Sequence, residues 1–328
     1  MGKYIEFEDD IDLIVLSGDQ ITGNNCWKNC TEYYKLLAEF LTPYEIPWAV
    51  TFGNHDDMDY QTMSMNHSLP SQHTRQDLID VLKHFPLDLT QEGPSTVFGS
   101  TNYVLDIYIP KSTSASPNVI EIPDIGAQIY IFDTGGGQLP QQTEQNQIDW
   151  FRKKQQEATN IDPLLPAVAF QHIPTLDFDY GGESDETASS IDYGERQLSP
   201  REIEQDHYEE ATKCQGFRGQ KLTPLQDGDA GIVQALSDSG NVHFLAVGHD
   251  HGNDYCCPYS DSLKLCFGRH SGYGGYGHWA RGARLYELRL EANYGYSVPA
   301  DNPSLSMSWE SWVRLDSGKV ISHVTSDS

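Results

Sequence analysis

The chain has 328 residues, 21 of them basic and 48 acidic, and its formal net charge at pH 7 is −27. The negatively charged backbone of a nucleic acid is repelled by such an acidic protein surface. Nucleic acid is therefore not an expected partner. No uninterrupted apolar stretch approaches the ~18 residues that span a bilayer, and the N-terminus has neither the basic start nor the apolar run of a signal peptide. The length suits a single α/β domain over residues 1–328.

The first predicted elements are a strand and a helix. Residues 11–17 read IDLIVLS, an apolar run typical of a buried strand, and Gly18-Asp19 follows it. Residues 31–41 have helical spacing, with Thr31 suited to the N-cap and Pro43 to the stop. The side chains that this spacing predicts to face inward are Tyr33, Leu36, Leu37, Phe40 and Leu41.

A second buried strand is predicted over residues 48–52, and Gly53-Asn54-His55-Asp56 follows its end. Beyond it, the patterns predict a helix over 74–85, strands over 102–110 and 127–132, and a polar surface helix around 143–158.

Two later strands end in histidine. Residues 167–170 deliver Gln171-His172, and residues 242–247 deliver Gly248-His249-Asp250-His251. The acidic stretch of about 175–219 between them has no clear period, and it is interpreted as a substrate-side loop or a surface excursion. The remaining patterns predict a weak helix over 230–236 and strands over 263–267, 283–290 and 307–315.

Polar motifs thus follow buried strands repeatedly. The alternation of strand, polar loop and helix favours a layered α/β fold. Ligand sites in open α/β sheets gather at the carboxyl ends of strands. We therefore expect five side chains to converge although they are far apart in sequence: Asp19, Asn54, His172, His249 and His251.

The residue types in this set predict a site for borderline divalent metals. A carboxylate can bridge two ions, while imidazoles and an amide oxygen fill other positions without excess charge. Each motif alone has a simpler interpretation, because a Gly-Asp pair usually forms a turn and a single buried histidine is more often structural. The order of all four motifs, each at a strand end, favours the joint interpretation.

The motif order G-D, G-N-H-D, H and G-H-x-H resembles the calcineurin-like metallophosphoesterase superfamily. The segment GHDHGNDYCC from Gly248, the segment CFGRHSGYGGYGHWARGARLYEL and FQHIP at 170–174 further resemble the branch of Dcr2-type phosphatases and plant purple-acid-phosphatase-like proteins. The resemblance runs from about Asp12 to Leu290. It implies an α/β sandwich of two mixed β-sheets flanked by helices.

The resemblance implies roles for the metal ligands. Asp19 would bridge two divalent ions, and Asn54, His172 and His249 would complete one of the two sites. His251 would belong to the other site.

Four further residues receive roles at the substrate. His55 would lie near the leaving-group oxygen, and Asp56 would orient it, with simple loop capping as the alternative for Asp56. Arg269 and His270 stand where the family is often glycine-rich, and they could contact substrate phosphate, with a surface loop as the alternative.

Two departures from the family bear on the metals. The D-x-H motif on a strand before the Gly-Asp strand is absent upstream of Asp19, so the first βα unit and half of one metal site are expected to be missing. A truncated sequence and a natural form with one intact site both explain this, and we expect tight binding of at most one metal. Thr22 stands at the position of the tyrosine ligand of purple acid phosphatases, which leaves Mn, Zn or Fe(II) as candidates.

The implied function is hydrolysis of phosphate esters through a metal-activated hydroxide, with monoesters preferred and phosphoproteins among the expected substrates. The missing motif supports a second hypothesis, an inactive or impaired metal-binding pseudophosphatase with an interaction role. Six cysteines allow 15 pairings. Together with the sequons at Asn29 and Asn66, they favour a secreted or vacuolar location over the cytoplasm. The sequence gives no indication of oligomeric state.

Overall fold

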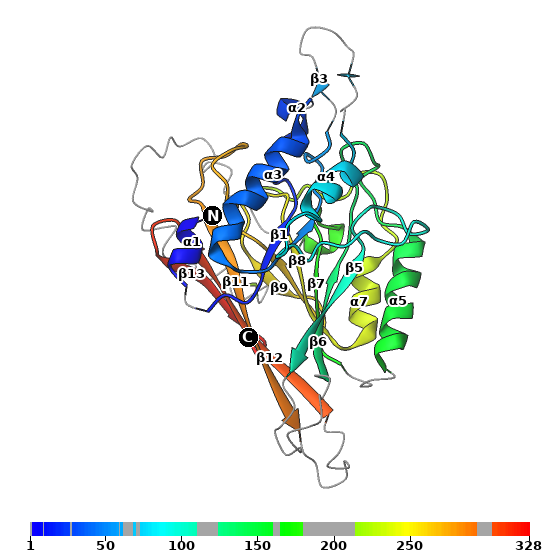
Figure 1. The fold of residues 1–328 in the computed structure, drawn as a ribbon. Coiled ribbons are helices and arrows are strands. Elements are labelled where there is room, and N and C mark those ends of the chain that lie inside the picture. Colours follow the sequence, from blue (N-terminus) through cyan, green and yellow to red (C-terminus); the bar gives the residue numbers. More distant parts are fainter. Residues whose placement is uncertain are drawn as a thin grey trace, which may run out of the picture.

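In a computed structural model, the structure describes residues 2–8, 10–26, 28–58, 60–61, 68–69, 73–109, 124–159, 165–179, 214–293 and 304–328 (Figure 1). The helices are α1 Gly2–Glu6, α2 Gly23–Cys26, α3 Cys30–Leu41, η1 Thr42–Tyr44, α4 Arg75–Leu82, α5 Gln145–Thr159, η2 Leu176–Phe178 and α7 Ile232–Ser239. The strands are β1 Ile14–Ser17, β2 Trp48–Thr51, β3 Tyr60–Gln61, β4 Ser68–Leu69, β5 Tyr103–Ile109, β6 Asp124–Ile131, β7 Ala167–Phe170, β8 Val242–Val247, β9 Cys256–Pro258, β10 Lys264–Phe267, β11 Gly282–Asn293, β12 Ser304–Leu315 and β13 Val320–Thr325.

The largest sheet has six strands in the order β5-β6-β7-β8-β10-β9. Its centre is parallel, because β6, β7, β8 and β10 run the same way, while β5 and β9 pair antiparallel at the two edges. Strands β7 and β8 are central and buried, which explains their continuous apolar sequences.

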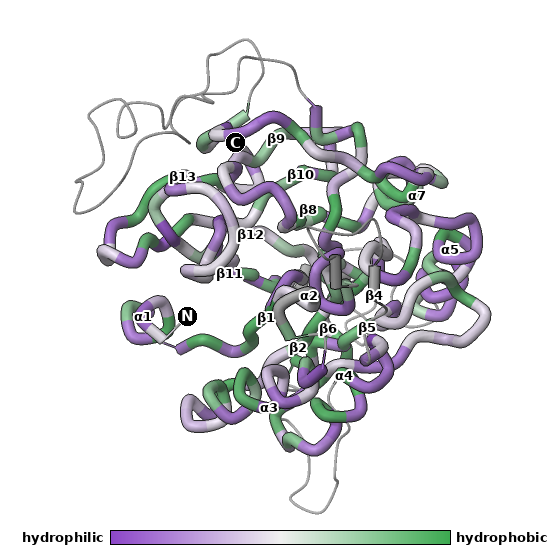
Figure 2. Tube along the Cα trace, turned by 90° about the horizontal axis from the view of Figure 1, so that it is seen from above, coloured by the Kyte–Doolittle hydropathy of each residue, from purple (hydrophilic) through white to green (hydrophobic). Residues whose placement is uncertain are grey.

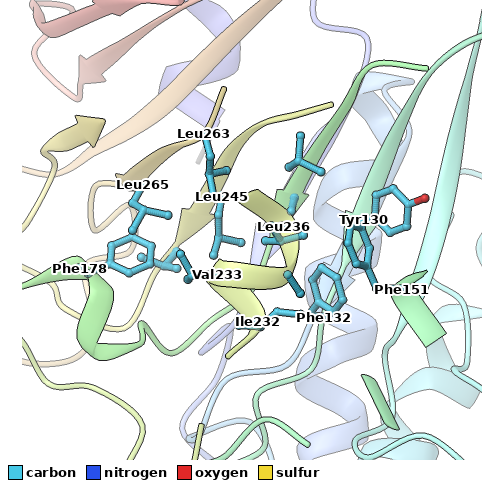
Figure 3. Close-up of a cluster of buried hydrophobic side chains, with 14 of the residues drawn as sticks. Tyr130, Phe132, Phe151, Phe178, Ile232, Val233, Leu236, Leu245, Leu263 and Leu265 are labelled. Carbon is cyan, nitrogen blue, oxygen red and sulfur yellow. The ribbon is translucent and has the colours of Figure 1, made fainter. Parts of the chain in front are cut away.

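Helices α5 and α7 cover one face of this sheet. Figure 3 shows the packing, in which Tyr130 and Phe132 of β6 lie beside Phe151 of α5, and Leu245 of β8 lies close to α7. These side chains alternate along each strand with residues that point to the opposite face, as the pleat requires.

The opposite face packs on a second β layer that has two parts. Strands β1 and β2 form a parallel pair, and β11, β12 and β13 form an antiparallel sheet. Both parts contribute to one core, in which Val15 and Ala49 join Phe244 of the large sheet and Trp309 of β12. In Figures 1 and 2, β1 and β11 lie at the facing edges of the two parts, and the residues the structure describes place no strand between them.

Helices α3 and α4 cover the outside of β1 and β2. Leu16 and Val50 point toward them, one residue away from the inward-pointing Val15 and Ala49. The layers are therefore helix, sheet, sheet, helix, and the expected α/β sandwich is confirmed. One layer is the mixed six-stranded sheet. The other layer consists of two separate sheets, β1-β2 and β11-β12-β13.

The predicted inward face of the first long helix is right for Leu37 and Leu41, which pack into the core, and wrong for the other three side chains. Tyr33, Leu36 and Phe40 are 48%, 59% and 45% exposed, whereas the buried side chains of α3 are Cys30, Tyr34, Ala38 and Leu41. A disulfide from Cys26 to Cys30 and a hydrogen bond from Tyr34 to Asp56 set the rotation of this helix. Spacing alone did not reveal these two constraints.

Most predicted strands are confirmed, and two of them, residues 167–170 and 242–247, have the predicted bounds. The first strand begins at Ile14 rather than residue 11. Strands β9 and β13 and the short helices α1 and α2 were not predicted. Most of the acidic stretch at 175–219 lies outside the described residues.

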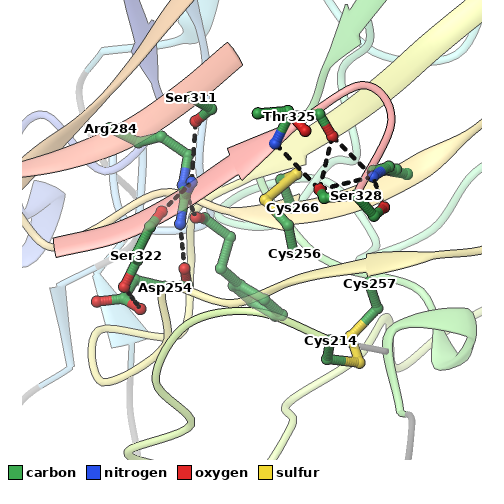
Figure 4. Close-up of a disulfide and its surroundings, with 12 residues drawn as sticks. Cys214, Asp254, Cys256, Cys257, Cys266, Arg284, Ser311, Ser322, Thr325 and Ser328 are labelled. Carbon is green, nitrogen blue, oxygen red and sulfur yellow. Dashed lines mark hydrogen bonds between the residues drawn. A yellow bond between two sulfur atoms is a disulfide. The ribbon is translucent and has the colours of Figure 1, made fainter. Parts of the chain in front are cut away.

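Three disulfides pair all six cysteines: Cys26–Cys30, Cys214–Cys257 and Cys256–Cys266. Figure 4 shows the last two beside Asp254, whose carboxylate accepts a hydrogen bond from Ser322 of β13 at 2.8 Å. The last two disulfides hold the β9 edge of the six-stranded sheet, and this buried carboxylate links it to β13. Within the described ranges, no helix has the length and apolar character needed to cross a membrane.

Candidate metal centre

Four loops meet at the carboxyl ends of four strands. Asp19 follows β1, Asn54 follows β2, His172 follows β7 and His249 follows β8. The first two strands belong to one layer and the last two to the other, so the side chains meet between the layers. The sequence predicted that these residues converge, and the structure brings them together.

The atoms that these side chains present lie close to one another. His172 Nε2 lies 3.1 Å from Asp19 Oδ2 and 3.3 Å from Asn54 Oδ1. His249 Nδ1 lies 3.3 Å from the same His172 nitrogen. Ligand atoms of Asp19, His172 and His249 all fall within 4.8 Å of one another, a grouping that could hold a metal ion.

The tautomer of His172 suits metal binding. Its Nδ1 lies 2.7 Å from the backbone oxygen of Ser17, and because a carbonyl only accepts, Nδ1 carries the proton. Nε2 is thus the nitrogen that faces the centre, and the strand that carries Asp19 fixes the orientation of the ring.

The charges in the centre depend on one another. Burial would raise the pKa of the Asp19 carboxyl, but His172 and His55 hold it well below its usual range. Burial would lower the pKa of His172, but Asp19 outweighs this effect and raises it. Burial and His172 lower the pKa of His249 to about 3, which keeps that ring neutral and able to bind a cation.

Glycines make room for the carboxylate and the imidazole. A Cβ atom on Gly53 would lie 2.2 Å from Asp19 Oδ1 and 2.7 Å from His172 Nε2, and one on Gly18 would lie 2.3 Å from His172 Nδ1. Asp19 and His249 themselves adopt positive φ angles of 54° and 64°. Such angles are uncommon for residues other than glycine, and they concentrate at functional sites.

Asp56 makes contacts that fit the capping alternative. Its buried carboxylate accepts hydrogen bonds from the backbone N–H groups of Asp19, Gln20, Ile21 and Gly53 and from the Tyr34 hydroxyl. His55 is not among these partners. Burial and the Asp19 charge raise the pKa of Asp56 to about 6. Asp56 therefore holds the two ligand loops together rather than orienting His55, which is nearer to the capping alternative.

His55 lies beside the centre. Its backbone N–H donates to Asp19 Oδ1 at 2.8 Å, so the residue helps to orient the Asp19 carboxylate. Its ring nitrogen Nδ1 is buried and has no hydrogen-bond partner within the described parts of the chain. The ring is thus close to the ligands and uncommitted.

Arg75, the first residue of α4, is a component that the sequence analysis missed. Its guanidinium is 2% exposed, pairs with Asp57 at 3.2 Å and with Asp133, and donates to the backbone oxygen of Gly53 at 2.9 Å. Further bonds run to the carbonyl oxygens of Gly135 and Gly136, and Gly136 lies against Asn54. No sequence pattern marks this contact, because it joins segments about 60 residues apart.

The other predicted site residues are His251, Arg269 and His270. His251 lies outside the compact group, with its Nδ1 3.0 Å from the backbone oxygen of Tyr276. His270 packs against the ring of His251. Arg269 is 9% exposed and donates to Asp254 and to the Ala280 carbonyl, both at 2.8 Å, and its contact with substrate phosphate stays a prediction.

The donor set fits a divalent cation. One carboxylate, one amide oxygen and two imidazoles suit Mn, Fe or Zn, and the glycines leave their atoms unobstructed. Asp19, Asn54, His172 and His249 would hold the ion.

Comparison with known proteins agrees with this geometry. The family model described as calcineurin-like phosphoesterase matches residues 2–253. The chain is 26% identical to probable inactive purple acid phosphatase 28 of Arabidopsis thaliana over 85% of this chain and 63% of that protein. It is 25% identical to probable inactive purple acid phosphatase 14 of Arabidopsis thaliana, over 93% of this chain and 69% of that protein. It is 24% identical to phosphatase DCR2 of Saccharomyces cerevisiae, over 86% of this chain and 44% of that protein.

The chain therefore spans between 44% and 69% of the length of these relatives. The family match covers the loops that carry all four converging ligands. The chain belongs to the calcineurin-like phosphoesterase family.

Proposed function

We propose that this chain is a metal-dependent phosphoesterase that hydrolyses phosphate monoesters at the Asp19 centre. The observation that carries the proposal is the convergence of Asp19, Asn54, His172 and His249 from four strand ends. A divalent cation bound there would offset the charge of the phosphoryl group and lower the pKa of water.

The chain's own residues would divide the remaining work. Asp19 would present its carboxylate in a fixed direction, because the His55 N–H holds one oxygen and His172 lies against the other. His55 would carry a proton to the leaving-group oxygen, as its uncommitted ring beside Asp19 allows. Asp56 and Arg75 would keep the two loops in register without touching the substrate.

The test is a pair of assays with added Mn²⁺, one with p-nitrophenyl phosphate and one with bis-p-nitrophenyl phosphate. We expect turnover of the monoester to exceed that of the diester. His55→Ala should lower kcat by about 10²–10⁴-fold, the usual contribution of a positioned acid. His278→Ala, an exposed histidine, is the matched control and should leave kcat unchanged. Equal loss in both variants, or none in either, would refute the role of His55.

A second candidate is a cation-binding protein without turnover. Two of the relatives carry the words "probable inactive" in their names. Within the described residues, Asp19 is the one carboxylate in the compact ligand group. This candidate predicts stoichiometric binding of a cation and no hydrolysis of either ester, so the assays above distinguish the two functions.

We further propose phosphoproteins as substrates and an oxidising compartment as the location. Three disulfides without a free cysteine support the location, because such bonds persist in secreted and vacuolar proteins. Retention of all three bonds on purification from the native source without alkylation is the expected result, and free thiols there would contradict it.

A further inference from the structure

The loop between β10 and β11, residues 268–281, begins at the same edge of the sheet as the Asp19 centre. Strand β10 runs parallel to β8, and the Gly268 N–H donates to the backbone oxygen of Val247 at 2.8 Å. Ligand sites in α/β sheets lie outside the carboxyl ends of such strands. The loop after β10 therefore starts beside the segment that carries His249.

This loop contains three large aromatic side chains, and they lie in different surroundings. Trp279 is 3% exposed, and a Cβ atom on Gly219 or Gly252 would lie 2.7 Å from its ring, so it anchors the loop. Tyr273 and Tyr276 are 68% and 52% exposed. Burial accounts for the tryptophan, whereas the two tyrosines present ring surface to solvent.

Tyr276 is held in place by its ring, its hydroxyl and its backbone. The ring stacks on His251, with the centroids 3.9 Å apart and the planes at 12°. The hydroxyl accepts a hydrogen bond from Gln220 Nε2 at 2.9 Å, and the same nitrogen donates to the Asp250 carboxylate at 3.0 Å. The carbonyl lies 3.0 Å from His251 Nδ1. The ring is therefore ordered before a ligand arrives, which lowers the entropic cost of a contact with it.

Tyr276 also lies close to the metal centre. The imidazole that it covers, that of His251, comes two residues after the ligand His249. Burial is the main cause that raises the pKa of the Tyr276 hydroxyl, and the charges of Asp250 and Asp19 raise it further. The field of the Asp19 carboxylate thus reaches this ring, which presents exposed surface beside the centre.

We propose that Tyr276 is a specificity-determining residue that contacts the ester group of the substrate and favours aryl phosphates over alkyl phosphates. The inference rests on the proposed function, because it concerns the part of the substrate beyond the phosphoryl group at the Asp19 centre. Aromatic rings attract each other in offset-stacked or edge-to-face arrangements, beyond the gain from burial alone. An alkyl ester offers no ring for this contact. Among phosphoproteins, phosphotyrosyl side chains are therefore preferred to phosphoseryl ones.

The test compares two peptides of one sequence, one with phosphotyrosine and one with phosphoserine, in the presence of Mn²⁺. Tyr276→Ala should lower kcat/KM for the phosphotyrosine peptide by about 2–10-fold, the gain of an aromatic pair, and change the phosphoserine value little. Because an aryl leaving group is intrinsically more reactive, the change of the ratio in the variant carries the test. Tyr276→Phe keeps the ring while it loses the bond to Gln220, so it should retain the wild-type ratio.

Tyr273→Ala is the matched control, because Tyr273 is an exposed tyrosine of the same loop whose hydroxyl donates to Asp316, beyond the end of β12, at 2.8 Å. It should leave both values unchanged. Equal losses on the two peptides in Tyr276→Ala would show that the residue only supports the loop. Unchanged values would show that no substrate meets the ring, and either result overturns the inference.

A binding measurement separates this inference from the proposed function. In the presence of Mn²⁺, calorimetry should show that the wild type binds phenylphosphonate more tightly than methylphosphonate, and that Tyr276→Ala loses the difference. That result without turnover of either peptide would support the Tyr276 contact and refute hydrolysis. Turnover of both peptides by Tyr276→Ala at the wild-type ratio would support hydrolysis and overturn the contact.

Discussion

The four ligands come from two sheets that are held in different ways. His172 and His249 follow β7 and β8, which pair with each other inside the six-stranded sheet. Asp19 and Asn54 follow β1 and β2, which form a sheet of two strands. A backbone ladder thus fixes one half of the centre, whereas the buried side chains of Asp56 and Arg75 fix much of the other half.

This difference between the two sheets indicates where substitutions should disturb the metal centre most. On the six-stranded side, the ligand positions depend on many backbone hydrogen bonds that no single side chain controls. On the two-stranded side, a few buried charges carry the geometry, so single substitutions there should be costly. The predictions below test the polar contacts and the close packing on this side.

The largest expected effect is that of Arg75→Met. The substitution leaves Asp57 and Asp133 buried without their cation, which should cost about 3–5 kcal/mol of the free energy of unfolding. Urea denaturation at pH 7 measures it. Arg289→Met, which removes an arginine paired with Glu287 and Glu310 on the exposed surface, should change stability little. Similar losses in the two variants would contradict a special role for Arg75.

Gly53→Ala should come next. Its new Cβ would approach Asp19 Oδ1 and His172 Nε2 too closely, so it should reduce Mn²⁺ affinity beyond the ~10–100-fold of an outer-shell change. Gly274→Ala is the matched control, because nothing lies within 4 Å of its added Cβ. Calorimetric titration with Mn²⁺ measures both, and unchanged affinity in Gly53→Ala would place the cation elsewhere.

Asp56→Asn should weaken Mn²⁺ binding by about 10–100-fold, the range for partners that orient ligands. The amide has one acceptor oxygen and cannot serve all five donors that now bind the carboxylate. Asp88→Asn alters a carboxylate that accepts the Thr90 N–H, and it should bind Mn²⁺ normally. If Asp56→Asn binds as tightly as the wild type, the loops do not depend on this carboxylate.

The smallest effect is expected for Tyr34→Phe. It removes one of the five donors to Asp56, so stability should fall by about 1 kcal/mol. Double-mutant analysis with Asp56→Asn sharpens the comparison, because the two losses should not add if the residues act through one contact. Full additivity would show that Tyr34 acts independently.

The convergence of the ligands could be predicted from the sequence because ligand sites in α/β sheets generally gather at the carboxyl ends of strands. Strands were visible as short apolar runs, and ligands at their carboxyl ends must meet when parallel strands share a sheet or face one another. Asp19, Asn54, His172 and His249 each followed such a run, so their approach needed no knowledge of individual contacts.

The details that failed depend on contacts between distant segments. The rotation of α3 is set by a disulfide and by Tyr34 binding Asp56, neither of which appears in helical periodicity. Arg75 had no signal at all, because its partners lie in two separate loops, one after β2 and one after β6.

The most direct test of the metal centre is crystallography of the protein soaked with Mn²⁺, with anomalous differences collected at a wavelength where Mn scatters strongly. We predict a peak about 2.0–2.3 Å from Asp19, Asn54, His172 and His249. A peak at another position, or no peak with these four side chains ordered as described, would contradict the assignment of this centre.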